Sequence, residues 1–364
     1  MVTAKTQYSL TDARKYFEKH LAVGDYYEEG QTVMGRWFGE GAMRLALDGR
    51  VGRNEFLALC ENRNPSNGET LTQRQRMSGS SNRSSDRRVF YDFTFSPPKS
   101  VSIAGLVACD QNVIQAHHRA LRVALEEFEA FASTRVRKGT NNQDRVTSNV
   151  VAALFTHDTS RALDPHLHTH CIVFNATFDP VETRWKALQN HDLLRARRFA
   201  ENVYYHELAK DLGRLGYQMR NHPRGDFEIQ GISPELCRRF SKRHEQIERE
   251  LERLLSEKPE LATGNLKEIK EHLAEARRAR KIENITQEDL QRLWRGQLTE
   301  GEWMGLGQTR NPHGLAEQAK PSPPLDEAVT WAEEHLFDRH SVVLECNLWQ
   351  EALSRARGQD FSVA

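Results

Sequence analysis

The segment HDTSRALDPHLHTH, residues 157–170, joins two strand-like runs, Val146 to Thr156 and Leu167 to Ala176. The Asp, Ser and Pro residues between the runs are typical of a turn, so the two runs are predicted to pair as a β-hairpin. Upstream, Val89 to Ser96 alternates between its two faces as a strand does, and Pro97-Pro98 ends it. These runs predict the centre of an antiparallel sheet.

The hairpin carries an unusual number of histidines. Because side chains alternate along a strand, His166, His168 and His170 are predicted to share one face, and the hairpin brings His157 beside them. A single histidine in a strand is usually a hydrogen-bonded polar residue, but strict alternation favours a metal site. Imidazoles from adjacent strands, with no cysteine among them, suit a divalent ion with open positions, and zinc, manganese, nickel and copper all accept such ligands.

Three other features have both a structural and a chemical interpretation. Asp92 lies on the face of its strand opposite the apolar side chains. A carboxylate on that face either orients a ligand histidine or accepts a phenolic proton. A solvated aspartate fits the pattern equally well. Tyr16 lies on the apolar stripe of a predicted amino-terminal helix, and Tyr26-Tyr27 follow it. By pattern alone these tyrosines are packing residues.

The remaining periodicity predicts an α+β fold with a central antiparallel sheet and helices on one side. Prolines 312, 321, 323 and 324 mark a linker. The predicted helices, read from apolar stripes and breakers, lie at about 10–22, 54–61, 112–131, 190–215, within the mixed-charge region 233–298, and at 325–337 and 345–357.

Composition excludes several classes of protein. The 51 basic and 51 acidic residues balance, so the net charge of the chain does not favour binding to a polyanion. Any basic surface must therefore be local. Five cysteines without a CxxC pair argue against a disulfide scaffold and a zinc ribbon, and indicate a reducing cytosol. The sequence contains no run of eighteen apolar residues and no GxxxxGK[ST] loop. We therefore expect a cytoplasmic protein that neither enters a membrane nor binds ATP through such a loop.

Together, the segments KYFEKHLAVGDYYEEG (15–30), YDFTFSPPKSVS (91–102) and HDTSRALDPHLHTH (157–170) strongly resemble the MobF-type conjugative relaxases, the TraI and TrwC group. The similarity continues through ENVYYHELAKDLGRLGYQ (201–218). This resemblance implies the HUH relaxase fold over residues 1–300, in which the helices of region 233–298 form a helical clamp over the DNA strand. It further implies that 301–324 form a linker and that 325–364 begin a helicase-like region of a longer polypeptide.

The resemblance also implies roles for individual residues. Phe17 departs from the family, in which many members carry a second tyrosine at this place, and His166 lies where a non-ligand residue is common. The implied metal ligands are His157, His168 and His170, and the implied catalytic residues are Tyr16, Tyr26, Tyr27 and Asp92. Local positive charge, and for Arg161 also the family position, add the DNA-binding candidates Arg161, Lys99, Arg74, Arg76 and Arg135.

The implied activity is metal-dependent nicking of single-stranded DNA at a plasmid transfer origin, in which a tyrosine forms a 5′-phosphotyrosine and the ends are later rejoined. The implied cofactor is one divalent ion, Mg²⁺ or Mn²⁺, with Zn²⁺ or Ni²⁺ as substitutes in crystals. The implied partners are transfer-origin DNA, relaxosome accessory proteins and a type IV secretion coupling protein, and we expect a monomer. Two alternatives stay open: a hydrolase that activates water at the histidines, and a metal-stabilised DNA-binding module without cleavage.

Overall fold

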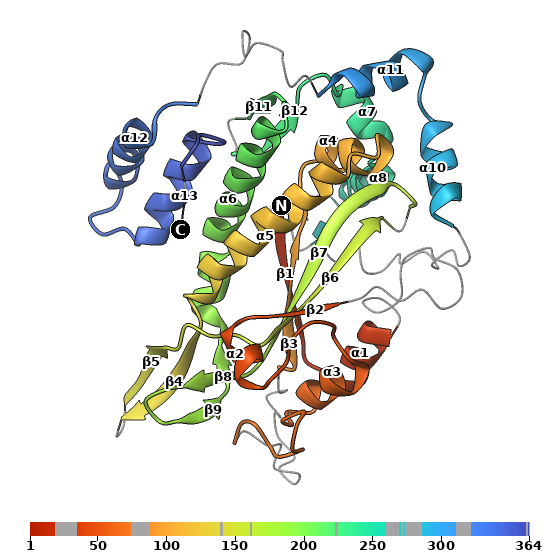
Figure 1. The fold of residues 1–364 in the computed structure, drawn as a ribbon. Helices are drawn as coiled ribbons and strands as arrows, with labels where there is room; N and C mark the ends of the chain where they lie inside the picture. The colour runs from red at the N-terminus through yellow and green to blue at the C-terminus, as the bar shows by residue number, and fades with distance from the viewer. Residues whose placement is uncertain are drawn as a thin grey trace.

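The computed structural model describes residues 1–18, 35–73, 88–138, 141–160, 162–222, 225–258, 266, 269–270, 273, 286–310, 322–361 and 363. At its centre is a five-stranded antiparallel sheet with the order β1-β3-β7-β6-β2 (Figure 1). The predicted sheet is thereby confirmed. Its strands are β1 (Val2–Gln7), β2 (Arg36–Phe38), β3 (Phe90–Phe95), β6 (Ala152–Thr159) and β7 (Pro165–Phe174).

The predicted hairpin is formed by β6 and β7. His157 lies directly opposite His168 in the register, and Phe155 lies opposite His170. β6 begins at Ala152, later than the sequence pattern suggested, because Val146 still belongs to another strand, β5 (Asn141–Val146). The hairpin places the histidines of two strands on one patch of the sheet.

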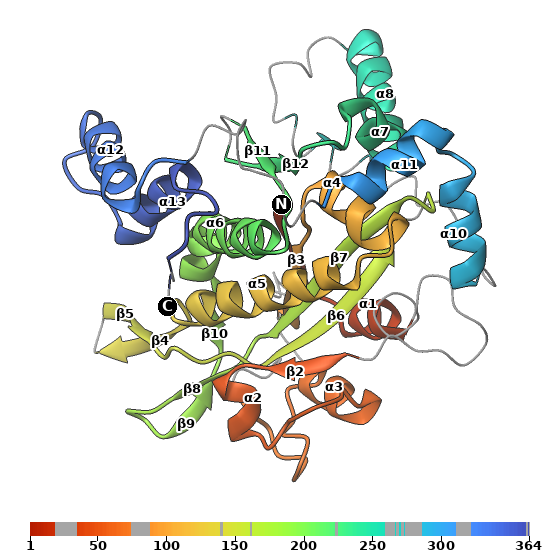
Figure 2. The same cartoon turned by 45° about the horizontal axis from the view of Figure 1, so that its top comes forward.

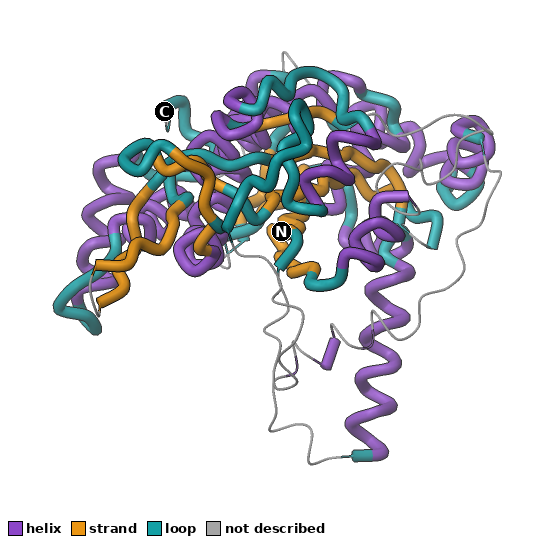
Figure 3. The backbone as a smooth tube through the Cα atoms, turned by 90° about the horizontal axis from the view of Figure 1, so that it is seen from below, coloured by secondary structure: helices purple, strands orange, loops and turns teal. Residues whose placement is uncertain are grey.

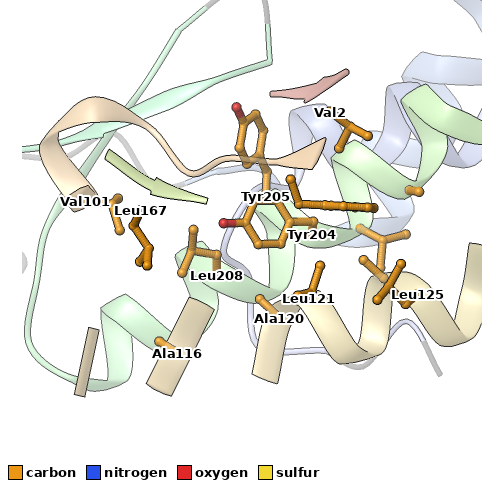
Figure 4. Packing of buried hydrophobic residues seen from close by; sticks show 14 of the residues in the cluster. Val2, Val101, Ala116, Ala120, Leu121, Leu125, Leu167, Tyr204, Tyr205 and Leu208 are labelled. Carbon is orange, nitrogen blue, oxygen red and sulfur yellow. The ribbon is translucent and has the colours of Figure 1, made fainter. Parts of the chain in front are cut away.

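One face of the sheet packs against two long helices, α5 (Gln111–Glu129) and α6 (Asn190–Arg214) (Figure 2). The alternation seen in the sequence decides which side chains enter this core: Tyr91, Phe93 and Phe95 of β3 are all buried in it. Figure 4 shows α5, α6 and the sheet contributing to the same apolar layer. This layer holds the strands in place beneath the histidines.

The second face is also covered, which corrects the expectation of helices on one side only. Three short helices, α1 (Leu10–Tyr16), α2 (Glu40–Arg44) and α3 (Arg53–Cys60), form a second apolar core with this face. The reason lies in the strands: Phe90 and Phe174 point to the same face as the histidines, farther along β3 and β7. Such side chains need cover, and α3 provides it, with Phe56 against Phe174 at 5.0 Å between ring centroids.

The mixed-charge region forms helices, as predicted, and one of them, α8 (Lys242–Glu257), projects from the body of the molecule (Figure 3). The same region contains α7 (Pro234–Arg239), which packs against α8, and the helices α10 (Gln287–Arg295) and α11 (Glu300–Gln308). α11 crosses the predicted boundary at residue 300, so the first part of the predicted linker is helical, and residues 311–321 lie outside the described part of the chain.

The carboxyl-terminal helices α12 (Leu325–Phe337) and α13 (Glu345–Arg355) occur where the sequence predicted them. α13 packs on α6, and α12 packs on α13. Leu353 of α13 belongs to the main core, and the guanidinium of Arg357, just after α13, donates to the backbone oxygen of Asn202 at 3.1 Å. Whether residues 325–364 begin a helicase-like region stays a prediction.

The other elements are short. Among the helices of the described residues, none is both long and apolar enough to cross a lipid bilayer. The remaining elements are α4 (Lys99–Ser102), the π-helix η2 (Ile103–Val107), β4 (Ser133–Lys138), β8 (Thr177–Asp179), β9 (Arg184–Lys186), β10 (Leu188–Gln189), β11 (Met219–Asn221) and β12 (Phe227–Ile229).

Candidate active site

Three histidines meet on the face of the sheet opposite the long helices. The ring centroids of His157 and His168 are 5.4 Å apart, those of His157 and His170 5.4 Å, and those of His168 and His170 5.1 Å. All three side chains are buried, with exposed fractions of 3% to 7%. We call these residues the histidine triad. His166 stacks on His168 at 4.6 Å and lies at the rim of the triad.

Two members of the triad are oriented through their Nδ1 atoms. His168 Nδ1 lies 2.8 Å from the backbone oxygen of His166, and His170 Nδ1 lies 2.9 Å from Asp92 Oδ2. Because a carbonyl and a carboxylate accept hydrogen bonds, each Nδ1 is assigned the proton, which leaves Nε2 as the electron-pair donor. This is the usual outer support of a metal-binding histidine.

Burial, followed by the neighbouring imidazoles of His166, His170 and His157, lowers the pKa of His168 well below 6.5. The neutral ring is the form that binds a metal ion. The triad therefore fits a divalent ion by its chemistry. In the described ranges, no group of three or more His, Cys, Asp or Glu side chains has the arrangement of a formed ion site.

Tyr16 reaches the same place from the last turn of α1. Its hydroxyl donates to Asp92 Oδ2 at 2.6 Å, and its ring meets that of His170 edge-on at 6.3 Å between centroids. Asp92 thus contacts both the tyrosine and a triad histidine. Strand alternation predicted the face of the sheet on which its side chain lies, and these contacts distinguish it from a solvated aspartate. Thr94 joins them, because its hydroxyl lies 3.2 Å from Asp92 Oδ1 and 3.0 Å from His170 Nδ1. Sequence reasoning did not single out Thr94 as a site residue, although it lies two residues after Asp92 and therefore on the same face of the strand.

The structure shows what Phe17 does at the position where many family members carry a tyrosine. One residue after Tyr16, its side chain points into the second core and stacks on Phe56 at 4.2 Å between centroids. Phe17 is 4% exposed, so burial of its ring stabilises the fold by roughly 1.5–3 kcal/mol. In this structure, position 17 contributes packing, and Tyr16 is the residue of the pair that faces Asp92.

Several predicted residues lie outside the described residues. They are the second pair of tyrosines, Tyr26 and Tyr27, and the arginines Arg74, Arg76 and Arg161. Their catalytic and DNA-binding roles stay predictions.

The structure places the two other DNA-binding candidates far from each other. Lys99 Nζ donates to the backbone oxygen of Pro165 at 2.9 Å, at the start of β7, and burial lowers the pKa of this amine to about 8. Arg135 is exposed on β4, and the β4–β5 hairpin extends from the end of the molecule remote from the tip of the β6–β7 hairpin (Figure 1). Contact of either residue with DNA stays a prediction.

The hairpin turn is held by a residue that the sequence did not mark. Trp294 of α10 is fully buried, and its indole N–H donates to the backbone oxygen of Leu163 at 2.7 Å. A tryptophan in a strongly charged helix is the only sequence signal of this contact. It joins the predicted clamp region to the turn between β6 and β7.

Comparisons with known proteins agree with this geometry. The family model described as TrwC relaxase matches residues 10–301. The multifunctional conjugation protein TraI of Escherichia coli K12 is 42% identical over 200 residues, and a second Escherichia coli TraI is 38% identical over 245 residues. These matches cover 53% and 62% of this chain but only 11% and 13% of the TraI proteins.

Solved structures extend the similarity in three dimensions. The conjugative relaxase TrwC in complex with oriT DNA and copper has a TM-score of 0.70 and 31% identity, covering 84% of this chain and 99% of that chain. TrwC with a 27-mer DNA that comprises the recognition hairpin and the cleavage site has a TM-score of 0.67 and 30% identity, with the same coverage. The chain therefore belongs to the TrwC relaxase family, the MobF-type conjugative relaxases.

Proposed function

We propose that this chain nicks single-stranded DNA at a plasmid transfer origin by transesterification, with Tyr16 as the first nucleophile. One observation carries the assignment: Asp92 Oδ2 accepts the Tyr16 hydroxyl at 2.6 Å and lies 2.9 Å from His170 Nδ1. A phenol has a pKa of about 10 and needs a nearby base to attack at neutral pH. Asp92 is placed to supply that base.

In the proposed step the Tyr16 oxygen bonds to the scissile phosphorus while its proton passes to Asp92. The bond between phosphorus and the 3′-oxygen breaks, and the departing 3′-oxygen takes up a proton to become a hydroxyl. The product is a 5′-phosphotyrosine. Because one phosphoester replaces another, attack by a free 3′-hydroxyl reverses the reaction and rejoins the strand, and no nucleotide hydrolysis is needed.

The cofactor that we propose is one divalent ion, Mg²⁺ or Mn²⁺, held by His157, His168 and His170. Such an ion, when bound, withdraws charge from the nonbridging oxygens of the scissile phosphate. The chain's own contribution is to orient two of the imidazoles through His166 and Asp92 and to bury the ligand set. Relatives support the assignment, since TrwC has been solved with oriT DNA in metal-bound and metal-free forms.

DNA binding is proposed to involve the projecting helix α8 and the basic residues named above. Basic side chains that follow the phosphate backbone are typical of single-strand binding. We propose that the reaction takes place in the bacterial cytoplasm, with relaxosome accessory proteins and a coupling protein as partners. The relatives from Escherichia coli are named conjugation proteins, which supports a role in DNA transfer.

The test is a covalent-adduct assay with the whole chain. Labelled single-stranded oligonucleotides from the transfer origin of the plasmid that carries the gene are incubated with Mg²⁺ and run on a denaturing protein gel. We expect a labelled protein band for the parent and for Tyr8→Phe, an exposed tyrosine on the same part of the chain, and none for Tyr16→Phe.

Two other outcomes separate the alternatives. Free cleaved DNA that persists in every tyrosine variant would identify a hydrolase that uses water. Tight binding with no cleavage of any oligonucleotide in the set would identify a binding module and contradict the proposal.

A further inference from the structure

The start of β7 is less supported by the sheet than the rest of the strand. Pairing of β3 with β7 ends at Phe95 opposite Thr169. Among residues 165–168 of β7, the register pairs only Pro165 and His168 with β6, opposite Thr159 and His157, with an irregularity between the two pairs. His168 lies in this segment. Some other element must hold the backbone if this imidazole is to keep its direction.

The helices on the far side of the sheet supply that support, at every second residue of β7. Lys99 Nζ contacts the backbone oxygen of Pro165 at 2.9 Å, and the backbone N–H of Leu167 donates to the Ser102 hydroxyl at 3.2 Å. At Thr169 the contact comes from α5: His117 Nε2 lies 2.8 Å from the Thr169 hydroxyl. The contacts at positions 165 and 167 are made to backbone atoms of β7. The contact at Thr169 is made to its side chain, which points to the face opposite the histidines at 166, 168 and 170.

The contact at Thr169 is the most constrained of the three. His117, Tyr204 and Thr169 are all 0% exposed, so none of their polar groups reaches water. His117 Nδ1 lies 2.6 Å from the Tyr204 hydroxyl, and the Thr169 hydroxyl is also 2.9 Å from that of Thr156 on β6. Tyr204 itself lies within the apolar layer between α5 and α6, as Figure 4 shows. A hydrogen-bonded chain in such a place admits little movement, because breaking any link leaves a buried polar group unsatisfied.

We propose that His117 is a positioning residue for the histidine triad: through the hydroxyl of Thr169 it fixes the β7 backbone between His168 and His170. It touches neither substrate nor ion. The inference rests on the proposed function only because it takes the histidine triad as the metal ligands. It adds a residue on the opposite face of the sheet that determines how tightly the triad binds the divalent ion.

The test measures Mn²⁺ binding to the apo protein by calorimetry, without DNA, and the thermal unfolding of the same samples. Thr169→Val removes the hydroxyl at nearly constant volume, and we expect Mn²⁺ binding to weaken about 10-fold, the loss typical of an outer-support change at a metal site. Thr169→Ser keeps the hydroxyl and should bind Mn²⁺ as the parent does.

The matched control is Thr147→Val. Thr147 is also buried, and its hydroxyl contacts the backbone oxygen of Ala132 at 3.1 Å and the Thr177 hydroxyl at 2.6 Å. It lies before the start of β6, outside the hairpin that carries the triad. This variant should lose thermal stability as Thr169→Val does while its Mn²⁺ affinity stays within about twofold of the parent.

A second pair of variants separates the two nitrogens of His117. Gln places a polar atom near the Nε2 position and Asn near the Nδ1 position, so His117→Gln should retain more Mn²⁺ affinity than His117→Asn. If Thr169→Val folds and binds Mn²⁺ like Thr147→Val, the positioning role is wrong and the network is structural only.

Failure of the proposed function gives a different pattern. If the parent binds Mn²⁺ and Thr169→Val weakens that binding, but no covalent adduct forms on DNA, the positioning role holds and the nicking assignment is wrong. If the parent does not bind Mn²⁺, the positioning role is contradicted as well.

Discussion

The histidine triad and the residues proposed to hold DNA are built in different ways. The triad is fixed by strand register, with His157 opposite His168 and Asp92 on the neighbouring strand. Arg135, by contrast, is an exposed side chain on an outlying hairpin, 4.0 Å from Asp144. Chemistry that depends on the sheet should therefore fail sharply when one residue changes, whereas DNA binding should decline in small steps.

The largest effect is expected for His168→Ala. Loss of one of three imidazole ligands should reduce divalent-ion affinity and the rate of adduct formation at least about 100-fold. His166→Ala is the control, since the backbone oxygen of residue 166 supports His168 and survives the substitution. Calorimetry and adduct formation over a range of Mg²⁺ concentrations measure both effects; equal losses in the two variants would contradict the ligand assignment.

Asp92→Asn should come next. The amide cannot take the Tyr16 proton, so single-turnover adduct formation should slow about 100-fold while the oligonucleotide still binds. The matched control is Asp144→Asn, which removes an exposed carboxylate from β5. Parent-like rates in Asp92→Asn would show that Asp92 is not the base.

The buried histidines of the framework predict a pH dependence of stability. Burial lowers the pKa of His117 well below 6.5 and that of His206 to about 4. Below pH 6.5 the unfolded chain takes up protons that these rings cannot accept in the native state, so stability falls as pH falls.

The expected loss is up to about 1.4 kcal/mol per pH unit for each such histidine. Urea unfolding between pH 7.5 and 5 measures it, and His206→Gln should flatten the dependence. A free energy of unfolding that stays constant over this range would be inconsistent with neutral buried histidines.

The smallest effect is expected for Arg135→Ala. Loss of a single phosphate contact should raise the dissociation constant for the oligonucleotide a few-fold and reduce its salt dependence by about 0.7 in the logarithmic slope. Adduct formation at saturating DNA should not change. Arg122→Ala, which removes an exposed arginine paired with Glu126 on α5, is the control. Slower adduct formation by Arg135→Ala at saturating DNA would contradict the distinction between the histidine triad and the DNA-binding residues.

The parts of the site that follow strand alternation were predictable from the sequence. The β6–β7 hairpin, the common face of His168 and His170, and the direction of Asp92 all depend on a period of two. Tyr16 required the family resemblance, because periodicity alone made it a packing residue.

Other features depend on tertiary contacts that a single sequence does not reveal. His117 looks like any histidine on an apolar helix stripe until its Thr169 contact is seen. Lys99 looks like an exposed phosphate ligand, yet α4 packs it against the start of β7. The second face of the sheet is covered by the short helices α1 to α3. Their apolar residues pack against Phe90 and Phe174, which come together only when β3 and β7 are paired.

The most direct measurement is to map the residue that becomes attached to DNA. The covalent adduct is digested with a protease and a nuclease, and the peptide that carries the nucleotide is sequenced by mass spectrometry. The account predicts a phosphotyrosine at Tyr16, the tyrosine whose hydroxyl meets Asp92. A first-strand adduct found at Tyr26 or Tyr27 and never at Tyr16 would contradict it.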